Sequence, residues 1–143
     1  MSDIVATPLP GETVQITTDP HTEPFWQAAK EERLVACQCA DCGHFRMPPT
    51  PFCPECQSTE KKWPELSGRG TVYSFAVVHG FPGLPDITVV GAVIDLEGAA
   101  PARLVTNVVD IDPDEVVIGM DVEVRFSLIS DGWKLPVFRP VTD

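Results

Sequence analysis

The C-terminal half of the chain has the residue pattern of a β-protein. Five segments there are rich in β-branched and aromatic residues and are separated by turn residues: Thr71–Val78, Thr88–Leu96, Arg103–Val109, Val122–Ile129 and Pro136–Arg139. Between the third and fourth segments, Asp112 caps a single helical turn that begins at Pro113 and ends at Gly119. Five strands with a short helix after the third follow the plan of an OB-fold barrel. Gly70 and Gly91 lie where strands would bend sharply to close it.

The N-terminal half predicts one short helix. Phe25, Trp26 and Ala29 recur at helical spacing, with Thr22 as the capping residue and Pro24 in the first turn. We expect a helix of about ten residues. Its two aromatic side chains are the expected anchor in the core.

We expect a mainly β fold with three parts along the chain. Residues 1–21 contain three prolines and little periodicity, which is typical of an extended arm that lies on a partner or is disordered. Residues 22–66 contain the helix and a cysteine-rich segment in which repeated prolines exclude a second helix. Residues 67–143 form the five-stranded barrel.

Two pairs of cysteines carry the clearest chemistry in the sequence. Two residues separate Cys39 from Cys42, two separate Cys53 from Cys56, and ten lie between the pairs. Each pair spans a tight turn that directs two sulfur atoms to one point, and two such turns form a tetrahedral four-thiolate site. The sequence therefore predicts a rubredoxin-like zinc ribbon.

The cysteine pattern leaves some alternatives open. Iron uses the same paired arrangement as zinc, and two disulfides use the same four residues. Gly43 suits the positive φ of a knuckle turn, whereas Gln57 stands at the equivalent place after the second pair. Cys37 is a fifth cysteine, and one intervening residue sends its side chain the same way along a strand as that of Cys39. We expect Cys37 to be a small buried hydrophobe and not a metal ligand.

A long apolar loop, Gly80–Pro85, is expected between the first two barrel strands. Glycines and prolines stiffen this loop, and Phe81 and Leu84 have no obvious strand face to fill. The two side chains either close the open end of the barrel or dock on a partner. The sequence alone does not decide between these alternatives.

Acidic residues predominate outside the cysteine-rich segment. The formal net charge is −11, whereas residues 30–69 hold six basic and six acidic groups and are neutral. This neutral stretch is the side that an anionic ligand could approach. No apolar run nears the roughly 20 residues of a membrane span, and residues 1–5 lack the basic start of a secretory signal. We expect a cytoplasmic protein that does not enter a membrane and whose thiols stay reduced.

Several short motifs, in this order, carry a resemblance to a known family. They are Pro24-Phe25-Trp26, Cys39–Gly43, Pro48-Pro49, Cys53–Cys56, Leu66–Phe75, Asn107–Val109, Ile118-Gly119-Met120 and Pro136–Arg139. Over roughly residues 19–141 the chain resembles the acyl-CoA-associated zinc-ribbon/OB-fold family, the domain of unknown function 35 family. The glycine-rich entry to the first barrel strand and the turn before the fourth are more specific than the cysteines alone.

The resemblance implies an accessory subunit of thiolase-superfamily enzymes. Its partner in a hetero-oligomer would be a thiolase-like large subunit or a lipid-transfer-protein-like aldolase that cleaves steroid side chains. In such assemblies the large subunit carries the catalytic residues, and the small subunit helps to bind the acyl-CoA, a coenzyme A thioester. We expect four cations of the neutral segment to contact the coenzyme: Arg46, Lys61, Lys62 and Arg69. The resemblance does not choose between thiolysis, aldol cleavage and condensation.

Independent catalysis is not expected from this sequence. None of His21, His44 and His79 stands next to a nucleophile, and no glycine-rich phosphate loop follows a strand. Four protein ligands also leave a zinc ion no position for substrate. Nucleic-acid binding is the alternative function, since ribbons and OB-folds often serve it. The barrel half, however, has four basic residues against eleven acidic ones from Asp86 to Asp143, which would repel a polyanion.

Overall fold

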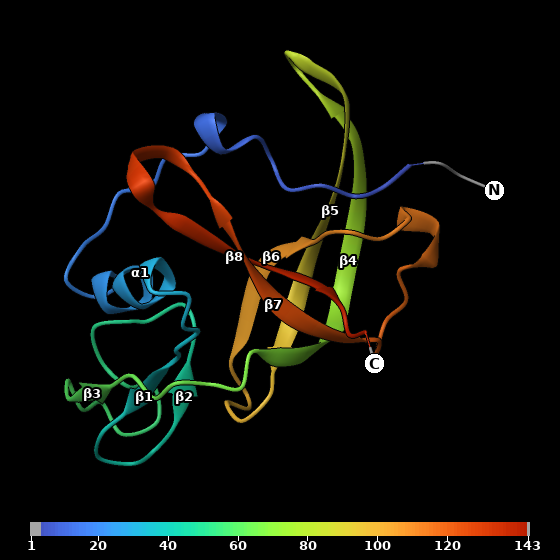
Figure 1. Cartoon of the computed structure of the whole chain (residues 1–143). Coiled ribbons are helices and arrows are strands. Elements are labelled where there is room, and N and C mark those ends of the chain that lie inside the picture. Colours follow the sequence, from blue (N-terminus) through green and yellow to red (C-terminus); the bar gives the residue numbers. More distant parts are fainter. Residues whose placement is uncertain (1–3, 143) are drawn as a thin grey trace.

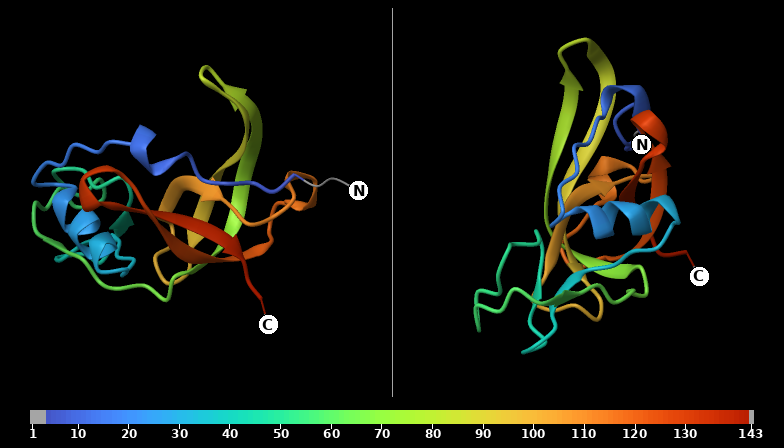
Figure 2. Two further views of the ribbon diagram at one scale, coloured as in Figure 1. Left: turned by 45° about the horizontal axis from the view of Figure 1, so that its top comes forward. Right: turned by 90° about the vertical axis from the view of Figure 1, so that its left-hand side faces the viewer.

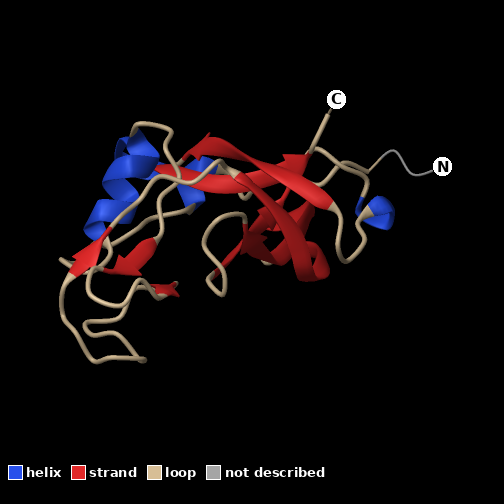
Figure 3. Cartoon of the chain, turned by 90° about the horizontal axis from the view of Figure 1, so that it is seen from below, coloured by secondary structure: helices blue, strands red, loops and turns tan. Residues whose placement is uncertain are grey.

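The N-terminal part of the chain folds into one helix and a small sheet. The structure, a computed structural model, describes residues 4–142. Helix α1 spans Glu23–Lys30, and the sheet contains β1 (Cys37–Cys39), β2 (Phe45–Arg46) and β3 (Lys61–Lys62) in the order β2-β1-β3. Seen from below, α1 and this sheet lie at the same end of the molecule, beside the barrel (Figure 3).

A closed five-stranded barrel forms the rest of the chain (Figure 1). Its strands are β4 (Arg69–Phe81), β5 (Leu84–Leu96), β6 (Arg103–Val108), β7 (Asp121–Leu128) and β8 (Lys134–Pro140). They close in the order β4-β5-β6-β8-β7. All neighbours are antiparallel except β6 and β8, which meet in parallel at Val108 and Phe138. The mainly β fold with a five-stranded barrel is therefore confirmed.

One buried cluster joins the helix, the ribbon and the barrel. Val90 and Ile94 of β5 and Phe138 of β8 are completely buried, and Phe25 of α1 belongs to the same cluster. Phe25 is therefore the core anchor that the sequence predicts, while Trp26 is only partly buried against the cluster. Because the parts share a core, the ribbon cannot move independently of the barrel.

Short 3-10 turns connect the longer elements: η1 (Gly11–Thr13), η2 (Pro113–Glu115) and η3 (Ser130–Gly132). The predicted cap at Asp112 is present, because its carboxylate accepts a hydrogen bond from the amide of Asp114 at 2.9 Å. The turn ends earlier than predicted, at Glu115. Thr22 occupies the N-cap position of α1 as predicted, but its side chain makes no capping bond. Asp19 instead accepts the amides of His21 and Thr22 at 2.8 and 3.0 Å.

The N-terminal arm packs on the chain's own barrel over its described part. Ala6 is completely buried; its amide donates to Ile111 at 2.8 Å, and its carbonyl accepts from the amide of Asp110. The amide of Thr7 donates to the carbonyl of Thr88 in β5 at 3.1 Å. Ala6 and Thr7 are thus held against the chain's own barrel, and residues 1–3 of the predicted arm lie outside the described residues. Within residues 4–142, no helix is long and apolar enough to cross a bilayer.

Gly70 and Gly91 play different roles in the barrel. A Cβ atom on Gly70 would lie 2.5 Å from the carbonyl oxygen of Asp95 and 2.7 Å from a methyl group of Ile94, whereas a Cβ on Gly91 would meet nothing within 4 Å. Gly70 is therefore required by the close approach of β4 to β5. Gly91 is not.

We predict that Gly70→Ala lowers the free energy of unfolding by about 1 to 3 kcal/mol, because the added methyl group overpacks a closed strand pair. Gly91→Ala is the matched control, and we expect it to be neutral or stabilising, since it reduces the entropy of the unfolded chain. Urea unfolding of both variants measures the difference. Equal loss of stability in the two variants would contradict this account of the barrel.

Candidate functional site

Four cysteine sulfur atoms converge at the tip of the ribbon. The Sγ atoms of Cys39, Cys42, Cys53 and Cys56 all lie within 4.8 Å of one another. Cys39 Sγ is 3.5 Å from Cys56 Sγ, and Cys42 Sγ is 3.6 Å from Cys53 Sγ. A tetrahedral zinc site with Zn–S bonds of about 2.3 Å requires sulfurs about 3.8 Å apart. The donor set and its spacing therefore fit one zinc ion.

The two cysteine turns have the same backbone geometry. Gly43 has φ +83° and its amide donates to the carbonyl of Cys39, while Gln57 has φ +65° and its amide donates to the carbonyl of Cys53. Gln57, which departs from the expected glycine, thus adopts the left-handed conformation at a non-glycine residue. The amide of Cys42 also points to Cys39 Sγ at 3.5 Å. Such amide contacts stabilise a metal-bound thiolate.

Hydrogen bonds divide the cluster into more and less acidic thiols. The amide of Cys42 lowers the pKa of Cys39 to about 6. Burial opposes ionisation of Cys53, yet amide bonds, first that of Cys56, leave its pKa lowered. The amide of Ser58 favours the Cys56 thiolate, but the Cys39 sulfur, burial and the other two cysteine sulfurs together outweigh it and raise the pKa of Cys56 to about 12. All four sulfurs ionise together only when a cation neutralises them, and a bound metal meets that condition.

Cys37 and Arg46 lie side by side on neighbouring strands of the ribbon. The two residues pair across β1 and β2, and Cys37 is completely buried, which raises the pKa of its thiol. Its sulfur is outside the four-sulfur cluster. Arg46 is only 6% exposed, and its Nη2 donates to the carbonyl of Thr50 at 3.1 Å. Arg46 therefore ties down the loop after β2 and does not present its charge to solvent.

Lys61 and Lys62 are neighbours in sequence but point in different directions. As consecutive residues of β3, they lie on opposite faces of the small sheet. The Nζ atom of Lys61 is 2.9 Å from Nδ1 of His21, which links the ribbon to the segment before α1. Lys62 is exposed, and no ion pair or hydrogen bond involves its side chain among residues 4–142.

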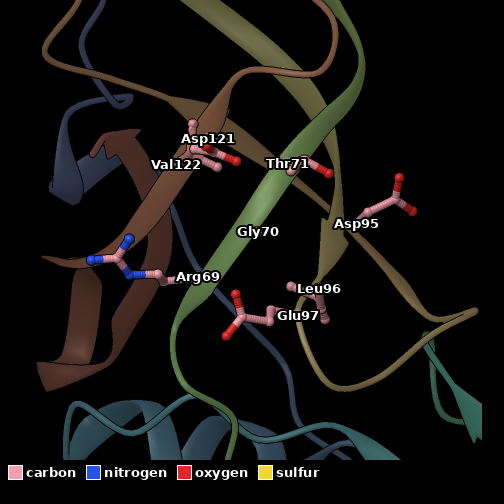
Figure 4. A pocket seen from close by; sticks show the side chains of 8 residues that line it. All are labelled: Arg69, Gly70, Thr71, Asp95, Leu96, Glu97, Asp121 and Val122. Atoms are coloured by element: carbon pink, nitrogen blue, oxygen red, sulfur yellow. The ribbon is translucent and has the colours of Figure 1, made fainter. Parts of the chain in front are cut away.

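Arg69 lies at the start of β4 in a pocket of about 360 Å³. The pocket also contains the carboxylates of Asp95, Glu97 and Asp121, so negative charge exceeds positive charge around it. Figure 4 shows the Arg69 guanidinium extending away from the Asp95 and Glu97 carboxylates. This arrangement opposes the approach of a phosphate group. Of the predicted cations, Lys61 and Lys62 thus lie on opposite faces of the small sheet, and Arg69 lies among carboxylates at the start of β4.

A second pocket of about 360 Å³ is predominantly apolar and joins three parts of the chain. Its walls come from α1, the ribbon loop and β6: Thr22, Phe25, Trp26, Met47, Pro48, Pro49, Arg103, Leu104 and Val105. Val105 is 78% exposed although it lies in a barrel strand. The sequence does not predict this pocket, because the motifs Phe25-Trp26 and Pro48-Pro49 do not reveal that β6 lies against both.

The predicted apolar loop is the tip of a long β-hairpin. Strands β4 and β5 continue to Phe81 and Leu84, which pair with each other across the turn. Neither side chain belongs to the buried cluster of the chain, and the hairpin projects away from the barrel (Figure 1). The two residues therefore do not close the end of the barrel. The loop prediction was wrong because prolines are tolerated near the ends of edge strands.

One histidine contacts a hydroxyl group of a residue that is not its neighbour in the sequence. His79 Nδ1 is 3.3 Å from Oγ1 of Thr88, its cross-strand partner. Thr88 is only 8% exposed, so its hydroxyl is not accessible to a substrate. We interpret the contact as a cross-strand pair that stabilises the hairpin.

Comparison with family models covers both parts of the chain. A model described as "ChsH2, rubredoxin-like zinc ribbon domain" matches residues 26–61, and one described as "ChsH2, C-terminal OB-fold domain" matches residues 63–127. The first supports the zinc assignment of the four-sulfur cluster.

Individual relatives extend these matches. A probable enoyl-CoA hydratase alpha subunit of Thermomonospora curvata is 43% identical over 117 residues, which are 81% of this chain but only 36% of that protein. A DUF35 domain-containing scaffold protein of Methanocaldococcus jannaschii is 37% identical over 110 residues, 74% of this chain and 77% of that one. The solved structure titled "Ltp2-ChsH2(DUF35) aldolase" matches with a TM-score of 0.80 and 37% identity, covering 90% of this chain and 100% of the matched one.

We predict one zinc per chain, held by the four clustered cysteines. Cys37→Ser should retain about one equivalent, whereas Cys39→Ser should lose the metal and much of the folded protein, because metal binding contributes on the order of 10 kcal/mol to such small modules. Elemental analysis of the purified proteins measures the metal and separates zinc from iron. Loss of metal from Cys37→Ser would contradict the assignment.

Proposed function

The chain belongs to the ChsH2 (DUF35) family of zinc-ribbon and OB-fold proteins, and on that premise we propose that it is an accessory subunit of a thiolase-superfamily enzyme acting on coenzyme A thioesters. Its partner would be a larger thiolase-like or Ltp2-like aldolase subunit in a hetero-oligomer. The observation that supports this most is the match over the full length of a ChsH2 chain from an aldolase whose title names two components.

The names of the relatives support the same role. One is an alpha subunit of a probable enoyl-CoA hydratase, and another is a scaffold protein. This chain spans about a third of the hydratase subunit. We therefore do not propose hydratase activity for this chain. The match to the scaffold protein covers 77% of that protein, which favours a supporting role over a reaction of its own.

The chemistry of the described residues agrees with a supporting role. The four cysteine ligands would hold the zinc in a closed site, where it stabilises the ribbon and has no position for a substrate. The Thr88 hydroxyl beside His79 is buried. The chain instead offers surfaces to a partner: the apolar pocket between α1 and β6, and the projecting hairpin with Phe81 and Leu84.

Contact with coenzyme A is the finer part of the proposal. Of the four predicted cations, Arg46 is buried, Lys61 is engaged by His21, and Arg69 lies among carboxylates. Lys62 is exposed, so we propose it as the cation of this set that contacts a phosphate group of the coenzyme.

Assembly and activity test the proposed function together. We predict that the tagged chain captures a thiolase-superfamily subunit, identified by mass spectrometry, and that carbon–carbon bond cleavage of acyl-CoA appears only in the assembled complex. The isolated chain and a Cys39→Ser variant serve as controls. Turnover by the isolated chain, or capture of no thiolase-superfamily subunit, would overturn the proposal.

The Lys62 contact has a separate kinetic test. We predict that Lys62→Glu raises the KM for the coenzyme A thioester of the assembled enzyme about tenfold, since a reversed charge faces the phosphates, while kcat and assembly change little. A variant at Arg46 would not serve for this kinetic test, because Arg46 is buried. An unchanged KM for Lys62→Glu would remove this residue from the coenzyme site.

A further inference from the structure

Strand β4 extends far beyond its second neighbour in the barrel. It pairs with β5 as far as Phe81, but it pairs with β7 only over Arg69–Thr71. Beyond Val72, whose N–H and C=O bond Met120 and Gly119, no hydrogen bond from outside the hairpin reaches the β4 backbone within residues 4–142. One edge of the hairpin is therefore open.

The direction of the backbone groups along this edge follows from the hydrogen bonds that β5 makes on its other side. The carbonyls of Thr88 and Val90 accept bonds from the arm and from the Asn107 side chain of β6, so both point away from β4. In an antiparallel pair, two residues opposite each other direct their N–H and C=O groups either both toward each other or both away from each other. Their β4 partners, His79 and Val77, therefore direct N–H and C=O groups away from β5.

Phe75 has the same orientation, because it faces Ala92, two residues after Val90. The open edge of β4 thus presents the peptide groups of Phe75, Val77 and His79. These three residues supply alternating donors and acceptors at the spacing of a β-ladder. An extended segment of about five residues is the structure that can bond all of them.

The opposite edge of the hairpin is already covered. Strand β6 pairs with β5 from Val90 to Asp95, and the arm bonds Thr88. The right-hand view of Figure 2 shows β4 along the outer margin of the hairpin, with β5 between it and the arm. Only the β4 side is therefore free to accept another strand.

The side chains of this edge lack the usual protection against strand pairing. Exposed edges commonly carry lysine, proline or inward-pointing charges. From Gly70 to Phe81, β4 contains no acidic residue, lysine, arginine or proline. The edge therefore carries no charged residue or proline that would oppose pairing with another strand. A second copy of this chain is disfavoured, because each copy carries a net charge of −11.

We propose that the free edge of β4 at Phe75, Val77 and His79 pairs with an extended segment of the thiolase-superfamily large subunit, which adds a strand to the hairpin. This inference rests on the proposed function for the identity of the partner. It adds a main-chain interface to the apolar contacts of the hairpin tip, with affinity from backbone hydrogen bonds and selectivity from the side chains beside them.

Hydrogen exchange of the wild-type chain tests the pairing residue by residue. The amides of Phe75, Val77 and His79 should exchange rapidly in the isolated chain and about a hundredfold more slowly in the complex purified with its large subunit. The intervening amides of Ala76 and Val78, which face β5, should be protected in both states. This alternating pattern distinguishes strand addition from general burial.

A matched pair of variants isolates the backbone donor. His79→Ala keeps the amide and removes the side chain, whereas His79→Pro removes the outward amide at an edge position that tolerates proline. We expect His79→Pro to bind the large subunit about tenfold more weakly than His79→Ala.

Each other outcome has a defined meaning. A stable complex in which the three amides exchange as in the free chain overturns strand addition and leaves the proposed function standing. Protection of these amides in the isolated chain at rising concentration identifies a second copy as the occupant and overturns the proposed partner. Failure of any thiolase-superfamily subunit to co-purify overturns the proposed function itself.

Discussion

The convergence of four thiolates at one point is the constraint on which the rest of the structure depends. Strands β1, β2 and β3 contain three, two and two residues, which is too little to hold a sheet by backbone bonds alone. Yet Val35 and Ala36, just before β1, belong to the buried cluster that also contains barrel residues. A metal that fixes the ribbon therefore also completes one side of the common core and positions the apolar pocket beside β6.

The features that the sequence predicts well are those determined by residues close together in the chain. The knuckles depend on spacings of two residues, and the cap at Asp112 depends on an amide two residues later. The barrel strands follow from local β-propensity. Thr22 precedes α1 as predicted, but its side chain makes no capping bond, and Asp19, three residues earlier, accepts the amides of His21 and Thr22. A local pattern cannot show which of two nearby capping residues bonds the backbone.

The features that the sequence did not reveal depend on contacts between distant segments. The neutral charge of residues 30–69 indicated where an anion could approach, but it did not show that Arg46 is buried or that Lys61 contacts His21. The arm likewise is fixed by bonds from Ala6 to residues more than 100 positions away. Prolines near the hairpin tip indicated a loop. The sequence gives no measure of how far two paired strands project, so the long hairpin was not predicted.

Native mass spectrometry of the co-purified complex, before and after removal of metal by a chelator, tests the central claim most directly. The account predicts a hetero-oligomer of this chain with a larger thiolase-superfamily subunit, with one zinc per copy of this chain, and it predicts dissociation when the metal is removed. The account would be contradicted by a chain that forms only monomers or homomers. A complex that remains equally stable without metal would contradict the dependence of the partner surface on the ribbon.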